Sequence, residues 1–475
     1  MTALAAPTAS APMGHIAPIL TSPVATAIAR PWLDWVILHL ITRFYFPLSR
    51  AWAAALVAEG DAHHFRTELG YDLPPAAVPA RALAKVARLK AAYRAADAAW
   101  IEAFFGPADP GPQALAAAER AWREASHRLM SARGFFLPLI LRHRVPAVRF
   151  RIPDRDEVDA TYKPLLAEPE RAYALPEGLP PVERSRAIER SWGREYWLRF
   201  PSPGPDRDTA WAHVMEPVAA AGAPTLVYGH GLAVELEAYD QIADGLVCLV
   251  PQGVRVIRLE APWHVRRAKP GWYGGELFMA TQPLGALDLF QAAVREMAIV
   301  AGWAREQGPG RVAFGGMSMG ALTAQLAAAR ARVWPERHRP DALFLVTTSD
   351  SVAALAFESG ISRGVGLPEA LEAAGWNAPT LDEYGALTDP GLMAPLPPAD
   401  IVMVLGRADK ITPCRRGASL ADHWHLPGRN LFVYDRGHFS VPIGLFRDRA
   451  PLERLAERLK QGAAASPTET AATAA

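Results

Sequence analysis

From about residue 31 to residue 145, hydrophobic positions recur every three or four residues, which is the spacing of amphipathic helices. Residues 80–105 and 113–133 each show this pattern, and the Gly- and Pro-containing segment 106–112 separates them. A further helix is predicted at the start of this region, over 31–48. We therefore expect a helical N-terminal segment over 31–145.

The helix predicted at 31–48 has an apolar stripe and also aromatic residues beside its polar face. The stripe consists of Leu33, Val36, Ile37, Leu40, Ile41 and Phe44. Trp35 and Tyr45 lie on the other side, which is typical of a helix that rests on a membrane surface. The alternative is that this helix packs against the main domain, and the small number of basic residues along it favours that alternative. Peripheral membrane contact through 31–48 is a hypothesis.

Beyond residue 146 the pattern changes to short β-type runs that alternate with helices. This alternation indicates βαβ units and a mostly parallel sheet covered on both faces. Eight strands are predicted, at 147–152, 195–200, 224–228, 254–259, 311–315, 342–347, 401–405 and 430–434. Helices are predicted at 234–247, 286–307, 318–332, 413–424 and 441–461. The loops at the carboxyl ends of such strands are where chemistry is expected.

Composition narrows the class of protein. Of the 475 residues, 50% are hydrophobic and 21% are charged, which is typical of a globular chain with a sizeable core. Lys and Arg number 50 against 49 Asp and Glu, so no bulk charge attracts nucleic acid. No run of 18 apolar residues is present to span a bilayer. The Ala-, Pro-, Ser- and Thr-rich segments 1–30 and 462–475 are predicted to be disordered tails.

The chain has only two cysteines, Cys248 and Cys414, which lie far apart in sequence. They make no disulfide framework and fit a reducing compartment, so we predict a cytoplasmic protein. If the 31–48 helix does contact a membrane, we expect that contact on the inner face. The histidines and cysteines show no metal-ligand spacing, and we expect no metal site.

A serine stands at the junction between a predicted strand and a predicted helix. Gly316-Met317-Ser318-Met319-Gly320 follows the strand at 311–315, and a helical run begins at once. A strand, a sharp turn and a helix with serine at the apex make a nucleophile elbow. Glycine on both sides leaves room for this strained turn, so Ser318 is the candidate nucleophile.

Two backbone N–H groups are the candidates for stabilising an oxyanion. Gly229-His230-Gly231-Leu232 follows the strand at 224–228, where the second donor of such an enzyme is found. We assign the donors to Leu232 and to Met319, the residue after the nucleophile. The alternative for the first of these is a simple glycine turn.

The acid and the base of a catalytic triad are expected after the last two predicted strands. Asp409 lies in the turn Gly406 to Pro413, where a carboxylate could hold an imidazole in the required tautomer. Asp350, after the strand at 342–347, is the competing acid. His438 follows the strand at 430–434, which gives the order Ser, Asp, His along the chain.

These residues resemble the α/β-hydrolase fold superfamily over about 146–461. The resemblance rests on the elbow at Ser318, the His230-Gly231 turn, the turn at Asp409 and the Gly437-His438-Phe439-Ser440 box. Within the superfamily, the elbow and the histidine box are similar to an abhydrolase-domain branch. The resemblance implies an α/β-hydrolase fold with a mostly parallel eight-stranded sheet flanked by helices. In such hydrolases, a segment in the position of residues 349–399 commonly forms a helical cap.

Two insertions are expected to cover the serine. The first is 349–399, whose apolar residues suit an acyl chain or serve only to pack the cap. The second is 260–285, which contains the possible substrate-binding residues Trp263, Arg266, Arg267 and Trp272. His230, in the earlier glycine turn, is a further possible substrate-binding residue. The three basic residues of this second insertion, Arg266, Arg267 and Lys269, could hold a phosphate or carboxylate headgroup or form a solvated face, and the second alternative is favoured.

The sequence predicts a serine hydrolase of carboxylic esters or thioesters, with lipid esters as one substrate class. No metal or organic cofactor is required by this chemistry. An acyltransferase that uses the same acyl-enzyme is the nearest alternative. A non-catalytic scaffold that keeps the fold is the other.

Overall fold

The computed structural model describes residues 31–461 except 234 and 236–244. The two tails predicted at 1–30 and 462–475 lie outside the described residues, and so does most of the helix predicted at 234–247.

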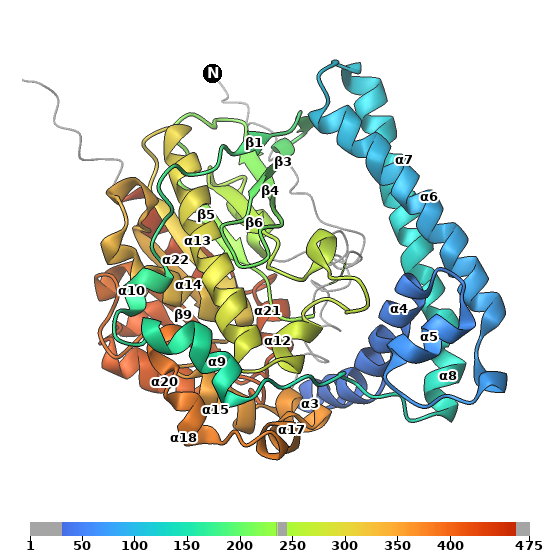
Figure 1. The fold of residues 1–475 in the computed structure, drawn as a ribbon. Coiled ribbons are helices and arrows are strands. Elements are labelled where there is room, and N and C mark those ends of the chain that lie inside the picture. Colours follow the sequence, from blue (N-terminus) through green and yellow to red (C-terminus); the bar gives the residue numbers. More distant parts are fainter. Residues whose placement is uncertain (1–30, 234, 236–244, 462–475) are drawn as a thin grey trace, which may run out of the picture.

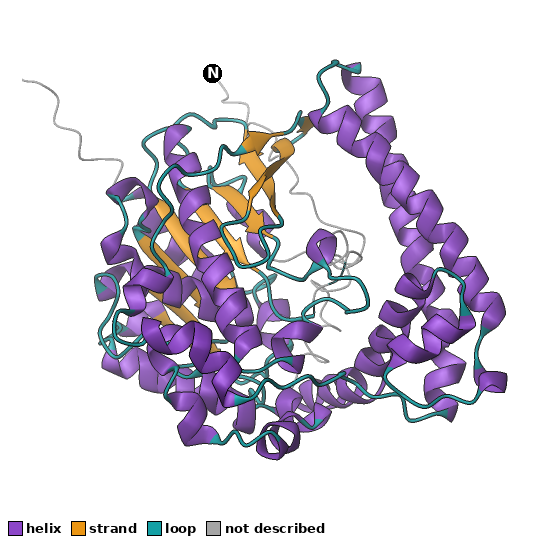
Figure 2. Ribbon diagram, in the orientation of Figure 1, coloured by secondary structure: helices purple, strands orange, loops and turns teal. Residues whose placement is uncertain are grey.

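A ten-stranded sheet forms the centre of the main body (Figures 1 and 2). Its order is β1-β3-β4-β6-β5-β7-β8-β9-β10, and β2 pairs with β3. The strands from β6 to β10 are parallel to one another, whereas β1 to β4 pair antiparallel and β4 joins β6 antiparallel. The bounds are β1 (Glu183–Arg184), β2 (Ile188–Arg190), β3 (Gly193–Pro201), β4 (Thr209–Pro217), β5 (Thr225–Gly229), β6 (Arg255–Leu259), β7 (Val312–Met317), β8 (Ala342–Val346), β9 (Ile401–Gly406) and β10 (Leu431–Tyr434). The predicted fold class is therefore confirmed, but the number of strands is ten rather than eight.

The strand predicted at 147–152 is wrong, since this segment is an extended loop. Its backbone does not pair with a strand: the Arg149 N–H donates to a Glu276 carboxylate oxygen and the Arg151 N–H to the Ala280 carbonyl. No strand was predicted over β4, in which the alanines Ala210 and Ala212 and the polar residues His213 and Glu216 weaken the β-type pattern. This strand is nevertheless buried along almost its whole length, because it lies between β3 and β6.

Helices cover both faces of the sheet (Figure 2). One face packs on α13 (Leu284–Glu306), α14 (Met319–Arg330) and α20 (Cys414–His423), which share a large apolar core with the sheet. The other face packs on the 3₁₀ turn η5 (Gly245–Leu249), α21 (Ser440–Gly444) and α22 (Ala450–Lys460). The parallel strands are buried on both sides, as their near-continuous apolar sequences require.

The residues predicted to form a cap are helical and lie between β8 and β9. They form α15 (Val352–Glu358), α16 (Gly360–Val365), α17 (Leu367–Ala373), α18 (Ala378–Asp382) and α19 (Gly385–Thr388). Two short helices from earlier in the chain, α9 (Arg155–Tyr162) and α10 (Pro169–Ala172), accompany them. The Trp376 indole N–H donates to the Pro153 carbonyl at 2.8 Å and fixes this packing.

The N-terminal helices stand beside the main body as an arm (right in Figure 1). The arm consists of α4 (Phe46–Ala58), α5 (Ala62–Leu69), α6 (Ala80–Phe105), α7 (Gly111–Ser131) and α8 (Leu137–Arg142). It has an apolar core of its own around Trp52, Phe65 and Phe136. At its start, α3 (Pro31–Leu40) and the π-helical turn η1 (Ile41–Tyr45) run directly into α4 and reach back under the main body.

The remaining elements are short. They are α12 (Glu276–Ala280) and the 3₁₀ turns η2 (Pro75–Ala77), η3 (Ala132–Phe136), η4 (Lys163–Leu165), η6 (Val265–Arg267), η7 (Ala331–Val333), η8 (Glu336–His338), η9 (Pro398–Asp400) and η10 (Gly428–Asn430). None of the helices in the described ranges has the length and apolar character needed to cross a bilayer.

Candidate active site

Ser318 lies at the turn between β7 and α14 in a strained backbone conformation. Its φ of 54° and ψ of −121° are unusual for a residue with a side chain. The neighbouring glycines explain how the turn is accommodated. A Cβ atom on Gly316 would lie 2.1 Å from the Gly320 carbonyl carbon, and one on Gly320 would lie 2.0 Å from the Gly229 carbonyl oxygen. The turn therefore has the geometry expected of a nucleophile elbow.

His438 and Asp409 form a buried pair at the ends of β10 and β9. The His438 Nδ1 atom lies 2.8 Å from Asp409 Oδ2, and each residue is only 4% exposed. The other oxygen of the carboxylate accepts the backbone N–H groups of Ile411 at 2.7 Å and Thr412 at 2.9 Å. The carboxylate is thus fixed from several sides. Because Nδ1 faces a carboxylate, Nε2 is left as the basic nitrogen of a neutral ring.

Asp350, the competing acid, is placed elsewhere. Its nearest charged partner is Arg416, at 3.5 Å, and burial raises the pKa of its carboxyl group above the usual value. The partner of His438 is therefore Asp409.

Ser318 is 9% exposed and follows β7, on the same edge of the sheet as the Asp409–His438 pair. Within the described part of the chain, no hydrogen bond joins its hydroxyl to His438. In serine hydrolases this bond is often loose until a substrate is bound.

The two predicted oxyanion donors flank Ser318. Met319 is the first residue of α14, so its N–H has no acceptor within the helix. Leu232 follows Gly231, where an added Cβ would lie 3.7 Å from the Ser318 Cβ. In the described part of the chain, no backbone carbonyl in a turn, loop or helix cap accepts the Leu232 N–H. Both N–H groups are thus near the serine and remain predicted donors.

His230, a predicted substrate-binding residue, has both of its ring nitrogens bonded to backbone groups. Nδ1 donates to the Gly231 carbonyl at 2.7 Å, and Nε2 accepts the Ala261 N–H at 3.1 Å. Burial lowers the pKa of His230 to about 4, which keeps the ring neutral as these bonds require. The next histidine, His264, accepts the Ala233 N–H at 3.3 Å. The two histidines therefore brace the loop that holds Leu232.

Arg267 and Trp263, which were predicted to bind substrate, both donate to carboxylates of the protein. Arg267 is 5% exposed, and its guanidinium donates to the carboxylates of Asp208 and Glu296 at 2.8–2.9 Å. The Trp263 indole N–H donates to Asp206 at 2.6 Å. These donors are already satisfied within the protein.

Arg266 faces the helical arm rather than the serine. Its side chain is 6% exposed and donates to Asp97 of α6 at 2.6 Å. Its guanidinium carbon also lies 4.5–5.8 Å from the ring centres of four tryptophans, Trp100, Trp122, Trp197 and Trp211. Two of these rings belong to the arm and two to the sheet. Arg266 therefore holds the two together by cation–π contacts.

Trp272 is likewise covered by arginines, one from α4 and two from the loop that follows α8. Arg149 lies 4.4 Å, Arg151 5.4 Å and Arg50 5.8 Å from its ring centre. Trp272 therefore packs at the junction with the arm, and substrate contact by this residue stays a prediction.

Two residues near the site were missed by sequence reasoning. The Asp34 carboxylate of α3 accepts the backbone N–H groups of Phe439 and Ser440, which directly follow His438. The Thr412 hydroxyl lies between Asp409 Oδ2, at 2.9 Å, and His438 Nδ1, at 3.2 Å. Asp34 is 405 residues from Phe439 in sequence, so no local pattern could reveal the contact. Its one signal was an isolated carboxylate in an otherwise apolar helix.

The described ranges contain no group of three or more His, Cys, Asp or Glu side chains arranged to hold a metal ion.

Residues 246–364 match the family model described as "Alpha/beta hydrolase domain containing 18". Among similar solved structures is acetyl xylan esterase 1 from Thermoanaerobacterium sp. JW/SL YS485. It is 15% identical, has a TM-score of 0.44, and the match covers 66% of this chain and 96% of that one. An acetyl xylan esterase from Paenibacillus sp. R4 is 16% identical with a TM-score of 0.45, over 65% of this chain and 96% of that one. A search of curated proteins found no match.

The sheet order, the elbow after β7 and the family match agree with one another. The mostly parallel sheet flanked by helices is the fold class predicted from the sequence, and residues 246–364 are similar to an α/β-hydrolase domain family.

Proposed function

We propose that this protein hydrolyses carboxylic esters or thioesters through an acyl-enzyme on Ser318. The proposal rests on two features at the same edge of the sheet. A serine stands in a strained elbow after β7, and a histidine after β10 is held by a buried carboxylate after β9. A metal is not needed for this chemistry.

In the proposed reaction, His438 Nε2 takes the Ser318 proton while the serine oxygen attacks the carbonyl carbon. The backbone N–H groups of Leu232 and Met319 stabilise the oxyanion that forms. The protonated His438 then gives its proton to the leaving alcohol or thiol. Water, activated by the same histidine, releases the acid and restores the serine. Asp409 stabilises the imidazolium in both halves of the reaction.

The substrate class is proposed from the residues around the edge. Most of the large apolar side chains of 349–399 pack inside the cap: Leu371, Trp376, Tyr384 and Leu387 are each at most 2% exposed. Leu355 and Phe357 of α15 are only partly buried and remain candidates for contact with an acyl chain. We therefore propose a lipid ester as the substrate class.

A panel of acyl esters and thioesters of graded chain length, together with phospholipids, tests this proposal. We expect hydrolysis by the wild type to fall by about a thousandfold or more in Ser318→Ala, because the acyl-enzyme cannot form. Equal rates in the two proteins would refute the proposed nucleophile. A maximum at acetyl or butyryl esters would refute the lipid-ester class and leave a hydrolase of small esters.

A further inference from the structure

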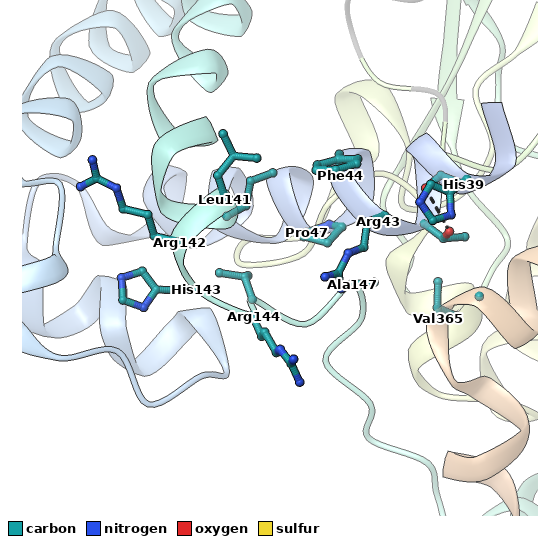
Figure 3. A pocket seen from close by; sticks show the side chains of 14 residues that line it. His39, Arg43, Phe44, Pro47, Leu141, Arg142, His143, Arg144, Ala147 and Val365 are labelled. Atoms are coloured by element: carbon teal, nitrogen blue, oxygen red, sulfur yellow. Dashed lines mark hydrogen bonds between the residues drawn. The ribbon is translucent and has the colours of Figure 1, made fainter. Parts of the chain in front are cut away.

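One surface of the molecule combines exposed aromatic side chains with unpaired cations. On α3, Trp32 is 56% exposed, Trp35 is 68% exposed and Leu40 is 48% exposed. Trp35 stacks on His39 of the next helical turn, with 5.9 Å between the ring centres. His39 in turn lines a cavity of about 620 Å³ between η1, the end of α8 and α16 (Figure 3). Leu141, which is 62% exposed, lines the cavity from α8.

The same cavity is lined by four further cationic or titratable side chains, Arg43, Arg142, His143 and Arg144 (Figure 3). None of these three arginines forms an ion pair within the described part of the chain. Arginines from the same segments that point inward are paired: Arg50 with Glu276 and Arg149 with Glu68. The unpaired arginines are therefore confined to the outer surface.

The residues that line this cavity include no Asp or Glu. Segments 35–58 and 132–153, which supply most of the lining, contain no Asp or Glu. Tryptophan and leucine side chains insert at the boundary between lipid headgroups and acyl chains, and arginines are attracted to anionic lipids. A protein partner with an ordinary polar surface would leave the large apolar side chains poorly matched.

We propose that this surface, which we call the α3–α8 face and define by Trp32, Trp35, Leu40, Leu141, Arg43, Arg142 and Arg144, docks on an anionic phospholipid membrane. The cytoplasmic leaflet is the anionic one, which agrees with the location expected from the two cysteines. The proposal does not depend on the hydrolase reaction, since the face and its test involve binding alone.

Flotation of the full-length protein with vesicles tests the proposal. We expect the wild type to float with vesicles of phosphatidylcholine and phosphatidylserine, and less with phosphatidylcholine alone or at high salt. Arg43→Ala/Arg142→Ala/Arg144→Ala should weaken the partition by about tenfold or more, because each cation near the surface contributes. Trp32→Ala/Trp35→Ala should weaken the partition into vesicles at low salt and at high salt alike.

Two matched controls keep this test specific. Arg120→Ala/Arg429→Ala removes two exposed arginines from α7 and from the opposite edge of the sheet. Leu392→Ala/Met393→Ala removes two apolar residues that are 66% and 86% exposed on the cap. We expect both to float as the wild type does. Absence of flotation, or equal losses in the controls, overturns the proposal. A dimer in solution that only Trp32→Ala/Trp35→Ala dissociates, without vesicle binding, also overturns it.

A different observation concerns the inward side of the same helix. Asp34 is 7% exposed, and its carboxylate accepts the Phe439 N–H at 2.6 Å and the Ser440 N–H at 3.2 Å. The Ser440 hydroxyl also donates to it. An added Cβ on Gly437 would lie 2.4 Å from the Asp34 Cγ, so the residues on both sides of His438 contact Asp34.

The continuation of the helix contacts the second loop of the site. The Tyr45 hydroxyl of η1 donates to the Ala233 carbonyl at 3.2 Å, one residue beyond Leu232. One helical run thus touches both the loop of the base and the loop of a predicted oxyanion donor. We infer that Asp34 is a positioning residue, which holds the His438 loop in the geometry needed for proton transfer. This inference rests on the proposed function.

Steady-state kinetics on a short soluble ester test the role of Asp34. We expect Asp34→Ala to lower kcat by about ten- to a hundredfold with KM within about twofold, because small displacements of a catalytic group are costly. Asp34→Asn, which can still accept the two backbone N–H groups, should recover most of the loss. Asp61→Ala is the matched control, since Asp61 caps α5 of the arm by a similar bond to the His64 N–H.

Labelling by a fluorophosphonate is measured first, so that the two ideas can fail separately. If Ser318→Ala is labelled like the wild type, the proposed function fails. If Ser318 is labelled and Asp34→Ala keeps the wild-type kcat, or Asp61→Ala loses as much, the positioning role is overturned. Thermal unfolding of each variant shows whether a loss reflects unfolding, and rescue by Asn distinguishes positioning from a loss of stability.

Discussion

The loops at the carboxyl edge of the sheet and the helices before residue 146 contribute to the site in opposite ways. The edge supplies the candidate chemical groups, each carried by a short stretch of sequence directly after a strand. The helices supply contacts that hold those stretches, and each contact joins residues far apart in the chain. Ser318 is made recognisable by four neighbouring residues, whereas Asp34 gains its meaning only from Phe439 and Ser440. The candidate catalytic residues are thus recognisable from short stretches of sequence, whereas the contacts that hold their loops join residues far apart in the chain.

Arginines show the same difference. Arg266 and Arg267 follow β6 near the edge, yet both are buried and held by protein groups. Arg43, Arg142 and Arg144 belong to the helical segment and line the outer cavity, and none of them forms an ion pair among the described residues. The arginines that follow an active-site strand are therefore bound by protein groups, whereas those of the helical segment are available to a ligand.

The largest expected effect is the loss of kcat on removing the triad acid at the carboxyl edge of the sheet. Asp409→Asn should lower kcat by about 10⁴-fold, because an amide cannot hold His438 in the required tautomer. Asp350→Asn, at the neighbouring strand, should change kcat by about twofold or less, because Asp350 faces Arg416. Steady-state kinetics on one ester measure both. A large loss in Asp350→Asn with none in Asp409→Asn would reverse the assignment of the acid.

An intermediate effect breaks the junction between the arm and the sheet. Arg266→Ala should destabilise the protein by about 3 kcal/mol or more, since it removes the ion pair with Asp97 and the cation among four rings. Urea unfolding measures this loss, with exposed Arg120→Ala as the control. An unchanged stability together with a raised KM for anionic esters would instead return Arg266 to substrate binding.

The smallest expected effect is a change in how the stability of the protein depends on pH, caused by a buried carboxyl group at the junction between the arm and the sheet. Burial raises the pKa of Glu260 to about 7, beside Arg266 at the same junction. A carboxyl group with a raised folded-state pKa stabilises the fold below its unfolded pKa, and this stabilisation is lost as the pH rises through about 7. Glu260→Gln should therefore gain stability relative to the wild type between pH 5 and pH 8, by on the order of 2 kcal/mol. Urea unfolding at the two pH values measures it, and parallel pH dependences in the two proteins would contradict it.

The fold and the triad candidates could be predicted because periodicity and short motifs encode them. Parallel strands alternate with helices, and glycines at 316 and 320 are required by the close approach of the backbone. The segment 147–152 resembles a strand because its apolar and basic residues alternate, although the partners of its backbone N–H groups are Glu276 and Ala280 of helix α12. Arg266 could not be assigned from sequence, since its cage comes from α6, α7, β3 and β4. What escaped prediction were the contacts between segments that are distant in sequence.

The most direct test of the central claim is the site at which a fluorophosphonate probe attaches. The wild type should gain one probe mass, and peptide mass spectrometry should locate it on Ser318. Ser318→Ala should gain none, and His438→Ala should react far more slowly. Attachment to another residue, or equal labelling of Ser318→Ala, would contradict the account.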